Sequence, residues 1–255
     1  MIQLRWFLFL ILSMGLSLSS ICVPSAESAN LAPNTLKSLI EKINAAANNR
    51  DSQKLMALYG DQFATTDGLT AESFSKALIS LWEKYPDLKY ITKLQSWNKI
   101  ERGWVAETLT TIEGTSETSG RIIQLRATIK ARQTFQNGKL LHQEILTERT
   151  ELNSGSNPPK VHIKLPDTVR VGEKFDFDVI VQEPLNEDLL AGTAISEKVD
   201  NDRYLEPGVM ELELLQAGGL FKRVRASDKP ENRWLSALLI RENGMTLVTQ
   251  RVRFR

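Results

Sequence analysis

Apolar residues recur at helical spacing in three segments near the start of the chain, ahead of a long region of alternating apolar and polar positions. In these segments the apolar side chains lie three and four positions apart, as on one face of a helix. The predicted helices are Asn34–Asn49, Asp51–Phe63, with Asp51 as N-cap, and Glu72–Tyr85. From Leu88 to Leu152, strand patterns follow one another through tight turns. Helices followed by an antiparallel meander predict an α+β domain whose helices pack on a curved sheet.

The clearest hairpin surrounds Asn137-Gly138, a pair that favours a two-residue type I′ turn. Before the turn, apolar residues at alternate positions from Ile123 to Phe135 predict one covered and one exposed face. Counting back from the turn pairs Gln136 with Lys139 and fixes the register of both strands. The covered face then carries four polar side chains, which form the candidate cavity site: Gln133, His142, Glu144 and Glu148.

In this register Glu144 and Glu148 lie opposite Ala131 and Ala127, which leave room beside the carboxylates. A carboxylate or imidazole on an apolar wall has a shifted pKa, which is how such groups become general acids or bases. The alternative stays open, because a single bulge would exchange the two faces. The imidazole would then be solvated, and the carboxylates would pair with Lys or Arg on a neighbouring strand.

Trp97 and Trp104 flank a second predicted hairpin, Asn98–Gly103. Two tryptophans on either side of a turn could form a binding rim, and we include both in the candidate ligand-binding set. They could equally form a cross-strand pair that stabilises the ribbon.

The run Asp51–Phe63, with Asp67-Gly68 shortly after it, resembles the nuclear transport factor 2-like superfamily. The resemblance covers about half of the chain and implies a strongly bent sheet that encloses a cone-shaped cavity. It says little about activity, since the superfamily holds isomerases, dehydratases, epoxide hydrolases and many non-catalytic modules. Its ketosteroid isomerases use a tyrosine and two aspartates that have no match here. Scytalone dehydratase uses a histidine with aspartate and tyrosines, and here only His142 could match in type, without its partners. We therefore assign no catalytic residue.

After Leu152 the pattern changes to short strands separated by turn residues, which predicts a β-sandwich. The run Leu165–Val179 resembles the opening of bacterial immunoglobulin-like domains. The Ser-Gly-Ser-Asn-Pro-Pro stretch in between is typical of a linker. The predicted fold is thus an α+β cone, with helices packed on a strongly bent antiparallel sheet, plus a second all-β sandwich domain. Its predicted boundaries are 30–152 for the cone, 153–159 for the linker and 160–255 for the sandwich.

The first 29 residues have the three parts of a secretory signal peptide. Arg5 precedes a short apolar core, and small residues near Ala29 offer cleavage positions. We therefore expect export to the periplasm or another extracytoplasmic compartment, with no stable membrane span after cleavage. An uncleaved anchor is the alternative. Cys22, the single cysteine, would leave with the signal.

Charge argues against nucleic acid as a partner, because the formal net charge is +1 and neither half has a basic excess. Arg251 belongs to a set of basic residues near the C-terminus that could form a strip, although strand alternation would divide the set between two faces. The predicted cone domain has one histidine, so we expect no dedicated metal site and no cofactor.

The sequence thus favours an exported, non-catalytic protein that binds a small apolar or amphipathic ligand in the cone or interacts with an envelope protein. A homodimer through the sheet is a further expectation. The alternative is an isomerase, dehydratase or hydrolase that uses a cavity carboxylate or histidine as acid or base. A third hypothesis is purely structural, with the cavity filled by its own side chains.

Overall fold

The structure is a computed structural model that describes residues 32–118, 120–184, 189–200, 204, 210–215 and 218–255. The predicted signal peptide lies outside these residues. Three helices lead the described part: α1 (Asn34–Asn48), α2 (Ser52–Ala57) and α3 (Ala71–Lys84). Asp51 is the N-cap of α2, where its side chain accepts a hydrogen bond from the backbone N–H of Lys54.

The second helix is shorter than predicted, because Tyr59–Thr65 forms a strand, β1, instead of continuing it. β1 runs parallel to the later strand β5, with Tyr59 beside Leu140. Tyr59 and Phe63 are buried, and both rings contact Phe74 of α3 at 5.5 Å between centroids. Burial of these aromatic rings and pairing to β5 outweigh the local helical pattern, which is a weak signal by itself.

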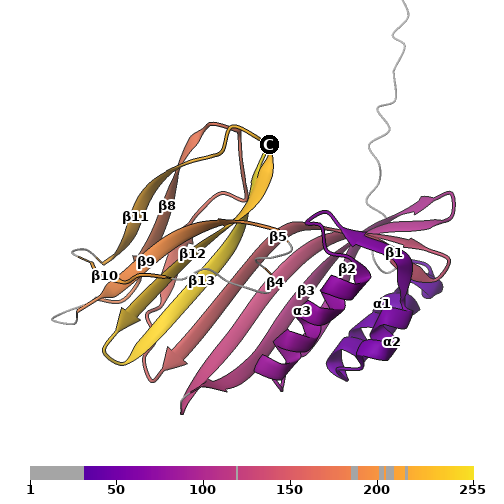
Figure 1. Cartoon of the computed structure of the whole chain (residues 1–255), viewed down its shortest axis with the longest axis horizontal. Coiled ribbons are helices and arrows are strands. Elements are labelled where there is room, and N and C mark those ends of the chain that lie inside the picture. Colours follow the sequence, from indigo (N-terminus) through magenta and orange to yellow (C-terminus); the bar gives the residue numbers. More distant parts are fainter. Residues whose placement is uncertain (1–31, 119, 185–188, 201–203, 205–209, 216–217) are drawn as a thin grey trace, which may run out of the picture.

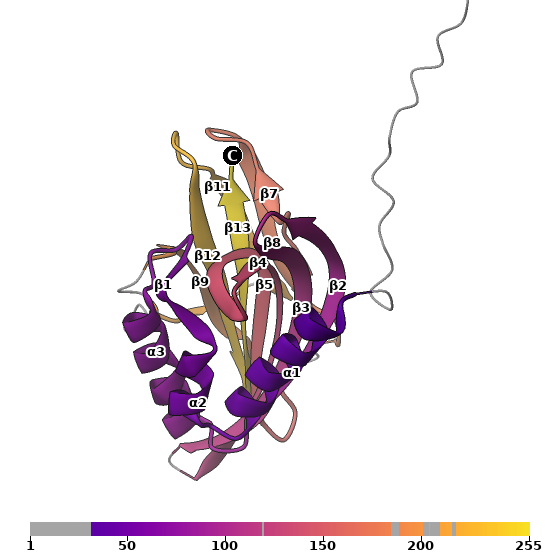
Figure 2. The same ribbon diagram turned by 90° about the vertical axis from the view of Figure 1, so that its right-hand side faces the viewer.

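Four long antiparallel strands form the meander: β2 (Lys89–Ile100), β3 (Gly103–Thr118), β4 (Arg121–Gln136) and β5 (Lys139–Gly155). The strands bend strongly, and the helices cover one face of the sheet (Figures 1 and 2). The buried core between helices and sheet contains Leu36, Trp82, Phe135 and Leu140. The predicted α+β arrangement of helices on a bent antiparallel sheet is confirmed for this half.

The Asn137-Gly138 turn is confirmed, since Gln136 pairs with Lys139 and both turn residues have positive φ, 51° and 74°. The register beyond the turn was predicted wrongly, because β5 is irregular at two places, after Leu140 and after Ile145. Each irregularity adds one residue to β5, and each extra residue exchanges the two faces.

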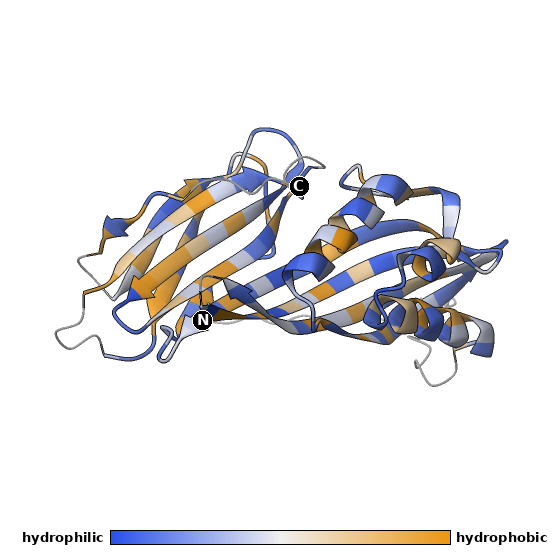
Figure 3. Cartoon of the chain, turned by 60° about the horizontal axis from the view of Figure 1, so that its bottom comes forward, coloured by the Kyte–Doolittle hydropathy of each residue, from blue (hydrophilic) through white to orange (hydrophobic). Residues whose placement is uncertain are grey.

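The remaining strands pack around a second core; three of them form a separate sheet, and the others extend the sheet of the meander. β8 (Lys174–Val181) is the centre of a three-stranded sheet between β6 (Val161–Lys164) and β11 (Gly219–Arg225). The strands on the other side of this core lie in the order β13 (Gly244–Phe254), β12 (Glu231–Arg241), β9 (Ala191–Lys198) and β10 (Glu213–Leu214). β7 (Thr168–Val169) also pairs with β13. Apolar residues gather on the strands of both halves (Figure 3). Val179, Leu239 and Val252 are among the buried residues of this core.

The predicted linker is wrong at its start, because Asn153, Ser154 and Gly155 belong to β5. There β5 pairs antiparallel with β13, from Gly155 opposite Gly244 to Arg149 opposite Gln250. The meander and the C-terminal strands therefore share one ten-stranded sheet, in which β13 lies beside β5 (Figure 1). Arg241 also donates to the backbone carbonyl of Asn157 at 2.9 Å, which holds the rest of the connection against the second half.

Candidate functional site

A cavity of about 510 Å³ lies between the helices and the concave face of the bent sheet. Its volume is within the range typical of small-molecule sites. Apolar side chains from α1, α2, α3 and β4 line most of it, among them Ile40, Leu55, Phe74, Leu78 and Ile129. The purely structural hypothesis requires a cone that is filled by its own side chains. The cavity shows that the cone is not filled in this way.

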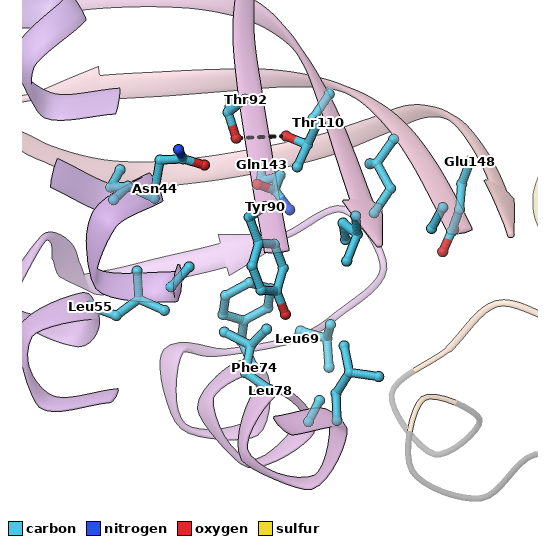
Figure 4. A pocket seen from close by; sticks show the side chains of 18 of the residues that line it. Asn44, Leu55, Leu69, Phe74, Leu78, Tyr90, Thr92, Thr110, Gln143 and Glu148 are labelled. Atoms are coloured by element: carbon cyan, nitrogen blue, oxygen red, sulfur yellow. Dashed lines mark hydrogen bonds between the residues drawn. The ribbon is translucent and has the colours of Figure 1, made fainter. Parts of the chain in front are cut away.

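Polar groups on the wall mostly pair with each other. Thr92 and Thr110 share a hydrogen bond of 3.1 Å across β2 and β3 (Figure 4). The Gln133 amide donates to Gln143 Oε1 at 2.8 Å. The exception is Asn44 on α1, whose Oδ1 is buried and has no hydrogen-bond partner within the described part of the chain. A buried acceptor without a partner is costly, and a bound donor would remove that cost.

Two tyrosines on the wall stay neutral. Burial raises the pKa of Tyr59 above its ordinary value, and the nearby Tyr90 adds to this effect. Burial likewise raises the pKa of Tyr90, although the hydrogen bond that its hydroxyl oxygen accepts from Trp82 at 3.0 Å acts in the opposite direction. A neutral phenol can donate its own proton, so Tyr90 offers the cavity a hydrogen-bond donor.

One end of the cavity borders a buried ionic cluster formed by both halves of the protein. The Arg251 side chain on β13 has no exposed surface, and it binds Asp67 in two-pronged geometry, with distances of 2.8 Å and 2.9 Å. Its Nε donates to Glu148 Oε2 at 3.0 Å. Trp234, the cross-strand partner of Arg251, donates to the same oxygen at 2.9 Å. Tyr204 accepts from Arg251 at 2.9 Å and donates to Asp67 at 3.0 Å.

The electrostatics of this cluster keep the guanidinium charged. Burial alone would lower the pKa of Arg251, but Glu148, Tyr204 and Asp67 raise it above its ordinary value. Burial, followed by the charge of Glu148, raises the pKa of Tyr204 as well. Asp67 comes from the turn between β1 and α3, so the cluster ties the helical side of the cone to the C-terminal strands.

Only some of the predicted site residues reach the cavity. Gln133 and Glu148 lie on its wall, and their role in ligand binding stays a prediction. His142 and Glu144 were placed wrongly on the covered face. The first irregularity of β5 turns both outward, where His142 lies opposite Thr134 and Glu144 lies opposite Arg132. His142 is exposed, and Glu144 accepts a hydrogen bond from Arg132 at 3.1 Å.

The second irregularity returns Glu148 to the covered face, opposite Ile129 instead of the predicted Ala127. Trp97 and Trp104 lie on the same face of β2 and β3 and pack against the core of the cone. Neither residue is among those that line the cavity. The predicted binding rim therefore does not border this cavity, and both rings pack against the core.

The partners of Glu148 are not predicted from the sequence. Arg251 was grouped with a surface strip, although its neighbours Val248 and Val252 are also buried. Asp67 enters the sequence interpretation only through the run that carries the family resemblance. Arg251 alternates with Thr249 and Arg253 along β13, so the local pattern gives no signal of its burial, and a buried charge needs a partner. Which partner it finds depends on how the two halves pack.

The profile of a family described as "Domain of unknown function (DUF8623)" matches residues 156–255. The search of curated proteins found no match. Among solved structures, the chain is similar to Bd1075 of Bdellovibrio bacteriovorus, at 20% identity and a TM-score of 0.32, over 43% of this chain and 38% of that one.

A second similar structure is an LEH-like epoxide hydrolase of Mycobacterium tuberculosis, at 10% identity and a TM-score of 0.31, over 44% of this chain and 80% of that one. A third is an uncharacterized cystatin fold protein of Novosphingobium aromaticivorans, at 13% identity and a TM-score of 0.33, over 45% and 98%. At these identities and TM-scores, none of the similarities bears on the activity of this protein.

Two features are absent from the described residues. None of the described helices is both long and apolar enough to cross a membrane. The same residues contain no group of three or more His, Cys, Asp or Glu side chains that could hold a metal ion.

Proposed function

We propose that the protein binds a small apolar or amphipathic molecule in the cone cavity and does not transform it. The observation that carries the proposal is the cavity itself, with about 510 Å³ of space, walls that are mainly apolar and a few polar groups on them. This combination is typical of ligand pockets, in which apolar area supplies affinity and a few polar groups set orientation. Gln133 and Glu148 are the predicted residues that would contact the ligand.

The alternative is an isomerase, dehydratase or hydrolase, with Glu148 as its base. It has weaker support, because of the predicted acid–base candidates only Glu148 lies on the cavity wall, so no second candidate is there to act with it. Glu148 Oε2 accepts hydrogen bonds from Arg251 and Trp234, at 3.0 Å and 2.9 Å, which leaves Oε1 alone to take a proton. His142 and Glu144, the other candidates, face away from the cavity.

We also propose that the helical half is nuclear transport factor 2-like and that the strands after the connection form an immunoglobulin-like sandwich. The bent sheet under three helices supports the first assignment, and two sheets packed around their own core support the second. Export remains a proposal, based on residues 1–29 of the sequence alone. Sequencing the N-terminus of protein from its own host tests it, with the mature chain expected to begin between Glu27 and Asn30. An intact Met1 would indicate an anchor.

The binding proposal can be tested with a cavity-filling variant and a neutral fluorescent probe such as Nile red. Ala127 lines the cavity, while Thr128, the next residue of β4, is exposed on the opposite face. Ala127→Leu should weaken probe binding about 5- to 150-fold, because crowding the probe with a larger side chain costs about 1–3 kcal/mol. Thr128→Leu is the matched control and should leave binding unchanged. Equal affinities for the wild type and both variants would place the probe elsewhere and refute the proposal.

A further inference from the structure

Glu148 is the residue at which the cavity meets the buried ionic cluster. Its hydrogen bonds from Arg251 and Trp234 both end on Oε2. Among the described residues, no donor reaches Oε1. The side chain retains 16% of its surface exposed, and it lies on the cavity wall. One carboxylate oxygen is therefore available to a molecule inside the cavity.

The charges around this oxygen do not cancel within the described part of the chain. Arg251 supplies one positive charge, while Asp67 and Glu148 supply two negative charges. Asp67 occupies both Nη atoms of the guanidinium, so Arg251 is already fully engaged on that side. In a site of low dielectric, a residual negative charge is attractive to a cation. A ligand group with one positive charge beside Oε1 would bring the formal charge of this cluster to zero.

The other charged group on the wall is Lys84, near the end of α3. It is exposed, and its ammonium lies 5.7 Å from the centre of the Tyr85 ring. A charge in contact with water is screened, so it discriminates between ligands less than the enclosed carboxylate does. The positive charge of Lys84 would nevertheless favour an anionic ligand, the opposite of what Glu148 favours. An experiment can therefore separate the effects of the two residues.

The region opposite Glu148 suits an apolar body. Leu55, Phe74 and Leu78 point into the cavity at a distance from Glu148, which lies at its other end (Figure 4). Elsewhere on the wall, the hydroxyl groups of Thr92 and Thr110 hydrogen-bond to each other. A molecule that fills this space would place its apolar part among the helices and its polar head at the carboxylate.

We infer that the cone cavity selects amphipathic ligands with a positively charged, hydrogen-bond-donating head, such as a primary ammonium, which pairs with Glu148 Oε1. The inference rests on the proposed binding function and adds to it the chemical class of the ligand. A hydrogen bond to a charged group contributes about 1.5–3 kcal/mol, equivalent to about 10- to 150-fold in affinity.

The test compares three probes with the same alkyl chain and different heads: decylammonium, decanol and decanoate. Each is titrated calorimetrically into the wild-type protein, the two ionic probes below their critical micelle concentrations and decanol below its solubility limit. Decylammonium should bind at least about tenfold more tightly than decanoate, with decanol in between. Ala127→Leu should weaken all three to the same degree, which shows that they occupy the cavity.

Because the head would meet a neutral acceptor in place of a charged one, Glu148→Gln should reduce the preference for decylammonium over decanoate to less than about threefold. Its amide oxygen can still accept from Trp234 and Arg251. Lys84→Met is the matched control and should keep the preference. If Glu148→Gln does not fold, the comparison of heads in the wild type still decides.

The outcomes separate this inference from the function on which it rests. Equal affinities for the three probes would overturn the charged-head inference and leave apolar binding intact. A preference for decanoate that Lys84→Met abolishes would overturn it in favour of an anionic ligand. If none of the three probes binds, the proposed function fails and the inference fails with it.

Discussion

Replacing Arg251 with methionine removes the charge at the centre of the buried cluster while keeping a side chain of similar length. The variant leaves Asp67 and Glu148 without their counterion, in side chains that are only 3% and 16% exposed. It also removes four hydrogen bonds of 2.8 to 3.0 Å to Asp67, Glu148 and Tyr204. Removing one partner of a buried ion pair costs about 3–5 kcal/mol, chiefly because the remaining charge is desolvated and unpaired.

The expected loss is therefore about 3–5 kcal/mol in the free energy of unfolding. Urea denaturation followed by tryptophan fluorescence measures it, and Trp234, whose ring lies 5.7 Å from the Arg251 guanidinium carbon, is a local reporter. Arg223→Met is the matched control. Arg223 and its partner Asp176 are separated by 2.8 Å but are 64% and 45% exposed, so the loss should be below about 1 kcal/mol.

A further variant tests the cause of the loss. If unpaired carboxylates are responsible, adding Asp67→Asn and Glu148→Gln to Arg251→Met should restore at least about 1 kcal/mol, because neutral amides cost less to bury than charges. The reasoning is refuted if Arg251→Met is no less stable than Arg223→Met. A triple variant as unstable as the single one would instead assign the loss to packing.

Three further predictions follow from the junction and the buried tyrosines. Gly155→Ala should lower the free energy of unfolding in urea by about 1–3 kcal/mol more than Gly138→Ala does. Both glycines have positive φ, but of the two only Gly155 would place a Cβ against backbone atoms, at Asn243 and Gly244. Equal losses of stability would contradict this. Fluorescence and circular dichroism should report one coincident unfolding transition, because β5 and β13 pair across the junction; two separated transitions would show independent halves. No tyrosine should ionise at its ordinary pKa of 10.0 while the protein is folded, so absorbance at alkaline pH should rise only with unfolding. The raised pKa values contribute stability that is present below pH 10.0 and is lost as the pH rises above it. A rise in absorbance before unfolding would contradict the burial of Tyr59, Tyr85, Tyr90 and Tyr204.

The sequence by itself determined the features that depend on near neighbours in the chain. Asp51 caps its helix through Lys54, three residues away, and Asn137-Gly138 adopts the positive φ values of its turn. Both follow from the intrinsic conformational preferences of the residues involved. The alternation before the turn also predicted the covered face of β4, on which Ala127 and Ala131 are indeed buried.

The tertiary structure decided everything that required knowledge of distant partners. The local sequence pattern does not predict the irregularities of β5. The strand pairs with β4 on one side and with β1 and β13 on the other, and it must fit both sides at once. They turned His142 outward and returned Glu148 to the cavity. Asp67 and Arg251 are 184 positions apart, and only packing of the two halves makes them a pair. A buried charge must find a counterion, but sequence spacing does not say which one, because that choice depends on the shape of the folded chain.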